Sequence, residues 1–133
     1  MAGKSDYLEN AVLNHVIGGP NYARPGVVYL ALYTVPPTDA GGGTEVSGAG
    51  YARAAVTNNA VNFPAAVAGV KQLAVAQSFP ESAGDWGTVV AMGIFDADPA
   101  GNLLYWSLLI SSVLIPAGST ATFLSNKLTL TED

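Results

Sequence analysis

The sequence has no cysteine and very little charge, and both shortages limit what the protein can be. Without cysteine there is no disulfide framework, no thiolate metal site and no cysteine nucleophile. Only 11% of the 133 residues are charged and 50% are apolar, whereas a typical soluble domain has roughly 25% charged residues. Intrinsic disorder requires low hydrophobicity and high charge. The composition therefore indicates a folded protein with part of its surface covered by another molecule.

Basic residues are scarce and scattered along the chain. Five lysines and arginines stand against ten carboxylates, which leaves a formal net charge of −5. Nucleic-acid binding requires basic side chains clustered on one face, because they must neutralise phosphates. We therefore expect no nucleic-acid partner.

No apolar run is long enough to cross a membrane as a helix. The longest, 103–115, is interrupted by three serines and ends at Pro116, whereas a spanning helix needs about 20 residues. The N-terminus continues into the polar run 3–6 and lacks the apolar core of a secretory signal. We expect a soluble protein that has no membrane partner and is not exported by the usual signal route.

The length allows a single domain over 1–133, since domains commonly run about 100–150 residues. Residues 5–17 predict its one helix. Ser5 or Asp6 is a suitable N-cap, acidic residues occupy the first turn, and the glycines at 18–19 with Pro20 end the segment. Its apolar residues recur at helical spacing and form the stripe Leu8, Val12, Leu13 and Val16. A helix this short is marginal alone in water, so the stripe must pack against something.

The rest of the chain has the pattern of short strands. Residues 27–33 form a continuous apolar run rich in β-branched and aromatic side chains, which predicts a strand covered on both faces. Further strands are predicted at 51–57, 61–63, 70–75, 76–79, 88–95, 103–110, 121–124 and 127–131. The alanine-rich stretch 64–76 is also compatible with a helical turn. Short strands at this spacing predict an all-β fold, an antiparallel β-sandwich with jelly-roll-like connectivity and one short N-terminal helix.

Residues 35–50 differ in composition from their surroundings. They contain two prolines and five glycines, and such a stretch is unlikely to hold a packed element. No lysine followed by serine or threonine closes the glycine run, so it is not a phosphate-binding loop. We expect a mobile arm that becomes ordered against a partner.

Few residues suggest catalytic or metal chemistry. His15 is the single histidine, and it lies on the predicted helix with no nucleophile motif nearby. Asp96, Asp98 and Gly101 match positions one, three and six of a calcium loop, but Ser107 stands at position twelve, where a bidentate glutamate is needed. Asp, Pro and Gly are also typical of a turn between strands, which is the interpretation we prefer.

Two further constellations have simpler structural explanations. Asp85 with the acids at 96 and 98 is compatible with a glycosidase pair, but ten acids in a β-fold form such pairs by chance. Trp86 and Trp106 are compatible with a sugar-stacking platform, and core packing is the more common role of such residues. The sequence thus predicts no enzyme, no catalytic residue, no cofactor and no metal.

Three segments carry a resemblance to a known family: SDYLENAVLNHVIGG at 5–19, YLALYTVPPTDAGGGTEVSGAGYARAAV at 29–56 and WGTVVAMGIFDADPAGNLLYW at 86–106. The most specific part is TDAGGGTEVSG at 38–48, followed by GYAR at 50–53. The chain resembles small structural proteins of tailed bacteriophages, which are often labelled tail fibre proteins. Their small size and β-rich pattern are also similar to those of head decoration, or cement, proteins.

The resemblance implies a structural role in the virion. The main hypothesis is a capsid decoration protein on the outside of the head, with the major capsid protein and further copies of itself, as a homotrimer, for partners. The alternative is a tail or tail-fibre-associated component, including a receptor- or carbohydrate-binding module. The candidate assembly contacts are Leu8, Val12, Leu13, Val16, Asp39, Gly42, Thr44, Glu45 and Val46.

Overall fold

The computed structural model describes residues 3–132, and in this part of the chain it contains one helix and ten strands. In chain order they are β1 (Gly3–Lys4), α1 (Asp6–Val16), β2 (Val27–Val35), β3 (Thr44–Glu45), β4 (Ala54–Thr57), β5 (Val70–Gln72), β6 (Gln77–Ser78), β7 (Gly87–Phe95), β8 (Leu103–Ile115), β9 (Thr122–Phe123) and β10 (Thr129–Thr131). The predicted all-β class with one N-terminal helix is confirmed.

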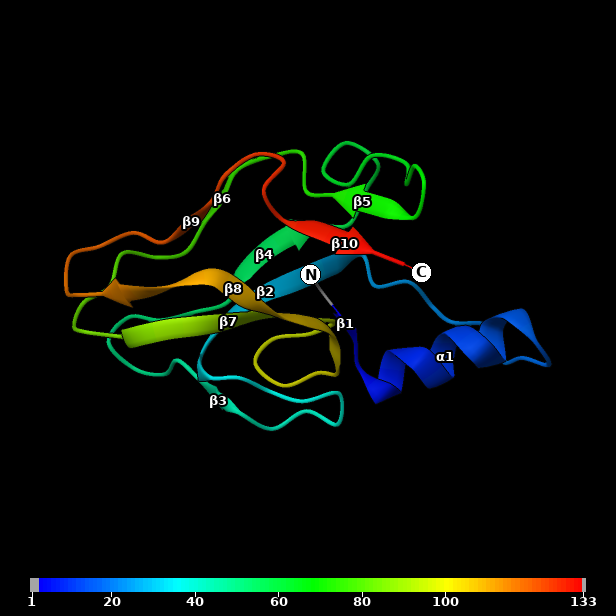
Figure 1. Ribbon diagram of the computed structural model, residues 1–133, viewed down its shortest axis with the longest axis horizontal. Helices are drawn as coiled ribbons and strands as arrows, with labels where there is room; N and C mark the ends of the chain where they lie inside the picture. The colour runs from blue at the N-terminus through cyan, green and yellow to red at the C-terminus, as the bar shows by residue number, and fades with distance from the viewer. Residues whose placement is uncertain (1–2, 133) are drawn as a thin grey trace.

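The main sheet is built around three long antiparallel strands. Its order is β1-β8-β7-β2-β3, and β4 pairs with a separate stretch of β2 (Figure 1). In the central ladder Leu30 of β2 lies opposite Ile94 of β7, and Ile94 lies opposite Tyr105 of β8. Since β2 and β7 are far apart in sequence, strand spacing did not predict this order.

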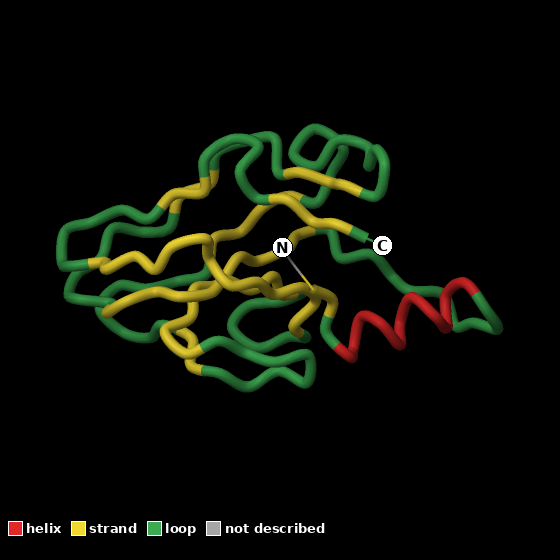
Figure 2. Tube along the Cα trace, viewed as in Figure 1, coloured by secondary structure: helices red, strands yellow, loops and turns green. Residues whose placement is uncertain are grey.

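A second layer covers one face of the main sheet. It consists of two short ladders, β5 with β10 and β6 with β9 (Figure 2). Leu73, Phe79 and Leu128 come from this layer and belong to the same buried cluster as Leu30 and Met92 of the main sheet. The main hydrophobic core therefore lies between the two layers, as in a sandwich.

The opposite face of the main sheet is also covered. Ala31 and Tyr33 alternate with the core-facing residues of β2 and form a smaller buried cluster with Ala91, Phe95 and Leu103. The continuous apolar run of β2 arises because both of its faces are buried. The prediction of a strand covered on both sides is confirmed.

Helix α1 projects from one end of the molecule and touches the sheet only at its start (Figures 1 and 2). Ser5 is the N-cap and accepts a hydrogen bond from the backbone N–H of Leu8 at 3.2 Å. Leu8 is the one buried residue of the helix. Within residues 3–132 no helix is long and apolar enough to span a membrane.

Several predicted elements differ from the structure. Residues 61–63 form a turn and no strand, because the Asn59 side chain accepts hydrogen bonds from the backbone N–H groups of Val61 and Asn62. The helical turn considered for 64–76 is absent from this described stretch, which instead contains β5. β8 continues beyond the predicted end at residue 110 to Ile115.

Candidate functional site

The first turn of α1 is anchored on the main sheet. The Ser5 backbone N–H donates to the Leu104 carbonyl at 2.9 Å, and the Ser5 hydroxyl donates to the Leu103 carbonyl. The Asp6 N–H donates to the Asp39 carbonyl at 2.8 Å. Leu8 packs into the main core and belongs to this anchor. It was expected to be a surface contact, but its burial leaves it inaccessible to a partner.

The remaining turns of α1 expose the apolar stripe. Val12, Leu13 and Val16 are all exposed, and Ile17 after the helix is more exposed still. His15 holds the returning chain, because its Nδ1 accepts a hydrogen bond from the Tyr22 N–H at 3.0 Å. That bond gives the single histidine a structural role.

The glycine-rich stretch is folded against the sheet. Thr38 and Gly41 exchange backbone hydrogen bonds of 2.9 and 2.8 Å and close a tight turn. The Asp39 carboxylate accepts a hydrogen bond from Trp106 Nε1 at 2.9 Å. Thr44 and Glu45 form β3 on the edge of β2. The prediction that this stretch holds no packed element is wrong, because β3 pairs with β2 and side-chain bonds from distant segments hold the turns.

The predicted contacts of this stretch therefore have different environments. Asp39, Gly42 and Thr44 are exposed, whereas Glu45 is half-buried and Val46 lies in the main core. Val46 is also held by its backbone N–H, which donates to the Leu32 carbonyl at 2.9 Å. Only the exposed members of the set are accessible to a partner.

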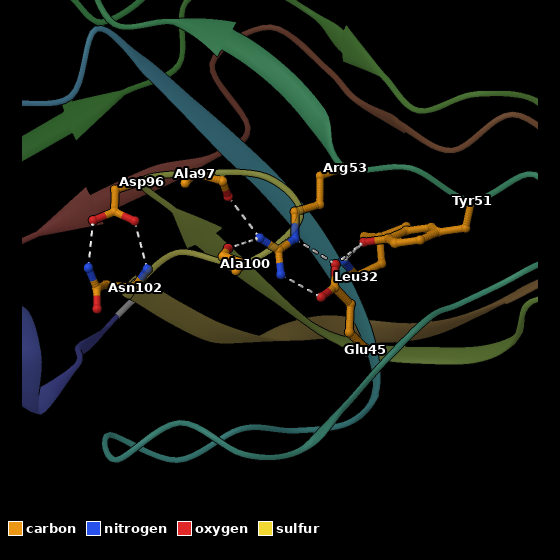
Figure 3. A network of polar contacts seen from close by, with 8 residues as sticks. All are labelled: Leu32, Glu45, Tyr51, Arg53, Asp96, Ala97, Ala100 and Asn102. Carbon is orange, nitrogen blue, oxygen red and sulfur yellow. Dashed lines mark hydrogen bonds and ion pairs between the residues drawn. The ribbon is translucent and has the colours of Figure 1, made fainter.

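Arg53 connects three segments through one guanidinium group (Figure 3). Its Nε and Nη2 donate to the two carboxylate oxygens of Glu45 at 2.9 and 2.8 Å, a bidentate ion pair. Nη1 donates to the carbonyls of Ala97 and Ala100 at 2.9 and 2.7 Å. The guanidinium carbon also lies 3.7 Å from the centre of the Phe95 ring. Arg53 thus fixes β3 and the 96–102 turn to the sheet.

Tyr51 extends the network into the core. Its hydroxyl donates to Glu45 at 2.8 Å and accepts from the Leu32 N–H at 3.0 Å (Figure 3). Burial raises the pKa of Tyr51 well above that of a free tyrosine, and the hydrogen bond to Glu45 acts in the same direction. Burial likewise raises the pKa of Tyr33 to about 12, with the charge of Glu45 adding to the effect. Both phenols stay neutral at physiological pH.

The acids considered for calcium binding serve a turn. The two carboxylate oxygens of Asp96 accept hydrogen bonds from the backbone N–H and the side-chain amide of Asn102, at 2.6 and 2.9 Å (Figure 3). Asp85 accepts the Ala117 N–H at 3.0 Å. Among residues 3–132 no group of three or more His, Asp or Glu side chains is placed to hold a metal ion. The turn interpretation of Asp96 and Asp98 accounts for the geometry.

The tryptophans do not form a common sugar platform. Trp86 is buried, packs edge-on against Tyr51 with ring centres 5.2 Å apart, and donates from Nε1 to the Ala49 carbonyl at 2.9 Å. Trp106 is half-buried and bonded to Asp39. Core packing is therefore the role of Trp86.

An apolar groove of about 630 Å³ opens between the second half of β8 and the 120–129 segment. Val89 and Phe79 reach it from the core, and Leu108, Ile110 and Leu124 are exposed along it. These residues were not among the predicted contacts. The apolar run 103–115 was the signal for them, but the pattern did not show which of its residues face outward.

The structure is an all-β protein with exposed apolar side chains on a projecting helix and beside a sheet edge, among other places. The family model described as Podophage GP4 fiber I protein gp80 matches residues 3–131, nearly the whole chain. The protein therefore belongs to this family of bacteriophage structural proteins and is a component of the virion. No curated protein sequence matches the chain.

Proposed function

We propose that this protein is a structural subunit of the phage tail fibre and that it acts through contact surfaces, without catalysis. The observation that carries the proposal is the family match over residues 3–131, whose description names a fibre protein. The match favours the tail-associated hypothesis over the capsid decoration hypothesis.

The surface of the protein supports a role in assembly. Exposed apolar side chains gather on α1 and beside the β8 groove, and only 11% of the chain is charged. Contiguous apolar surface on a small protein is typical of sites that become covered by a partner. Copies of this chain, in a homotrimer or another oligomer, and neighbouring fibre subunits are the partners that we propose.

The polar side chains support a role without catalysis. His15 and Asp96 are each engaged in a hydrogen bond that closes a turn or holds a segment. Glu45 and Arg53 neutralise one another inside the fold. Each of these groups therefore has a structural task.

The test is immunogold electron microscopy of purified virions with antibody raised against the folded protein. Gold on the tail fibres is the expected result. Gold over the capsid faces would overturn the fibre proposal in favour of head decoration, with the major capsid protein as the partner. The matched control is the same antibody blocked with purified protein, which must abolish the labelling.

A further inference from the structure

Helix α1 has an apolar face that its own subunit leaves uncovered. Leu13 and Val16 are 64% and 67% exposed, and Val12 lies beside them on the same face. The helix has 11 residues, and its contacts with the sheet are made through its first turn. Near its other end, His15 accepts a hydrogen bond from the Tyr22 N–H. An isolated helix of that length is marginal in water, so covering this face would stabilise it.

The β8 groove is the second uncovered apolar feature. Within residues 3–132, β1 pairs with β8 at Tyr105 and Trp106, and no strand pairs with the outer edge of β8 over residues 108–115. The groove beside this edge is deep enough to reach the core residues Val89 and Met92. An open sheet edge next to an apolar groove is a common binding site for a segment of another chain.

The two features lie at opposite ends of the molecule. In Figure 1 α1 extends from one end, and the end of β8 with the chain leading to β9 lies at the other. The helix of one subunit therefore cannot fill the groove of the same subunit. Each copy of the chain carries one exposed helix face and one groove, so the helix of one copy can fill the groove of another.

We propose that the exposed face of α1 in one copy docks in the β8 groove of the next copy. Val12, Leu13 and Val16 follow the i, i+1, i+4 spacing of a helix that binds a groove with one face. Ile110 is fully exposed and Leu124 is 61% exposed at the groove, where they can contact that face.

The charges agree with this pairing. Glu9 is exposed one turn before Leu13, on the same side of α1. Lys127 is exposed and lines the groove. A helix seated in the groove with Glu9 near Lys127 brings opposite charges together.

This contact joins unlike surfaces, so it is head-to-tail. Such contacts close into a ring when the rotation permits and otherwise extend into a filament. The inference rests on the proposed function for its biological setting, because it names a second copy as the partner within the fibre. Either geometry is suitable for a structural protein present in many copies.

The test uses two variants that each lose one half of the contact. The helix variant is Leu13→Glu with Val16→Glu, and the groove variant is Ile110→Glu with Leu124→Glu. Light scattering after gel filtration should show wild type above the 13.6 kDa monomer mass and each variant alone at that mass. Mixed together, the variants retain one intact helix and one intact groove and should form a dimer of twice the monomer mass.

Several outcomes would overturn the inference. Wild type that stays monomeric at high concentration, or a single variant that assembles alone as wild type does, would be such an outcome. A groove variant that still assembles would indicate helix-to-helix contact, and a mixture that stays monomeric would exclude head-to-tail pairing. The control is Val61→Glu with Val67→Glu, two exposed residues outside the groove and α1, and it should assemble like wild type.

A charge exchange tests the register of the contact. Glu9→Lys should weaken assembly several-fold, because it places two lysines together, and adding Lys127→Glu should restore it. Lack of rescue would overturn the pairing of these two residues. If gold labels the fibres while every variant assembles like wild type, the fibre role stands and the head-to-tail contact does not. If gold labels the capsid while the variants lose assembly as expected, the head-to-tail contact stands and the fibre role does not.

Discussion

Replacing Arg53 tests whether one guanidinium group holds the glycine-rich stretch and the 96–102 turn on the sheet. The Arg53 side chain is 8% exposed and makes four hydrogen bonds, two to Glu45 and two to the carbonyls of Ala97 and Ala100. Arg53→Met leaves the Ala97 and Ala100 carbonyls without this donor, and it leaves Glu45 unneutralised, still bonded to the Tyr51 hydroxyl. We expect the largest stability loss of any single polar substitution in this network.

The magnitude follows from the burial of the pair. Removing one partner of a buried ion pair costs about 3–5 kcal/mol. Glu45 remains 23% exposed, so water can solvate part of its charge and the expected loss is at the low end, about 3 kcal/mol. Arg53→Lys keeps the charge, but one ammonium cannot reach both the carboxylate and the two carbonyls. We expect that variant to lose about 2 kcal/mol.

The assay is urea unfolding followed by tryptophan fluorescence, with Arg24→Met as the control because Arg24 is exposed. The control should stay within about 0.5 kcal/mol of wild type. The double variant Arg53→Met with Glu45→Met should lose less than the sum of its single variants, because no unpaired charge remains. If Arg53→Met unfolds at the wild-type urea concentration, the hydrogen bonds of Arg53 contribute nothing to stability and this reasoning is refuted.

Three further predictions concern backbone conformation, ionisation and the core. Gly43 has a φ of +74°, and an added Cβ would lie 2.7 Å from backbone atoms. Gly42 has a φ of +80° and open space, so Gly43→Ala should lower the unfolding free energy more than Gly42→Ala, whose cost is roughly 1–2 kcal/mol; equal losses would contradict this. Tyr33 and Tyr51 should ionise after the other tyrosines in an absorbance titration at alkaline pH. Because the pKa of Tyr33 is raised to about 12 in the fold, its contribution to stability is complete below about pH 10 and falls as pH rises toward 12; early ionisation of both phenols would refute their burial. Trp86→Phe removes one buried hydrogen bond and should cost about 1–3 kcal/mol in urea unfolding, and a neutral result would contradict the packing described.

Local patterns in the sequence predicted much of the fold. Hydrophobic periodicity located the helix. Apolar runs bounded by turn-forming residues located β2, β7 and the start of β8. These local patterns gave the wrong element where a side chain bonded to the backbone and fixed a turn. The turn at 61–63 exists because Asn59 accepts two backbone N–H groups, although the residues themselves favour a strand.

The burial of the candidate contacts could not be inferred from the sequence as well as the strands could. The pattern placed Leu8 and Val12 in one apolar stripe, yet the structure buries the first and exposes the second. The difference arises because Ser5 anchors only the first turn on β8, through residues about 100 positions away in the chain. Residues in the β8 groove were not identified, since the second wall of the groove comes from the 120–129 segment.

Composition and periodicity established an all-β protein with one short helix, little charge and apolar surface in excess of what one small domain needs to bury. These properties depend on residues close together in the chain, so they can be inferred without the fold. Which apolar residues stay exposed depends on segments that meet across the molecule. Arg53 bonds to carbonyls 44 and 47 residues away, and contacts of that kind leave no local period. They hold the glycine-rich stretch in place and leave the far end of α1 and the β8 groove open.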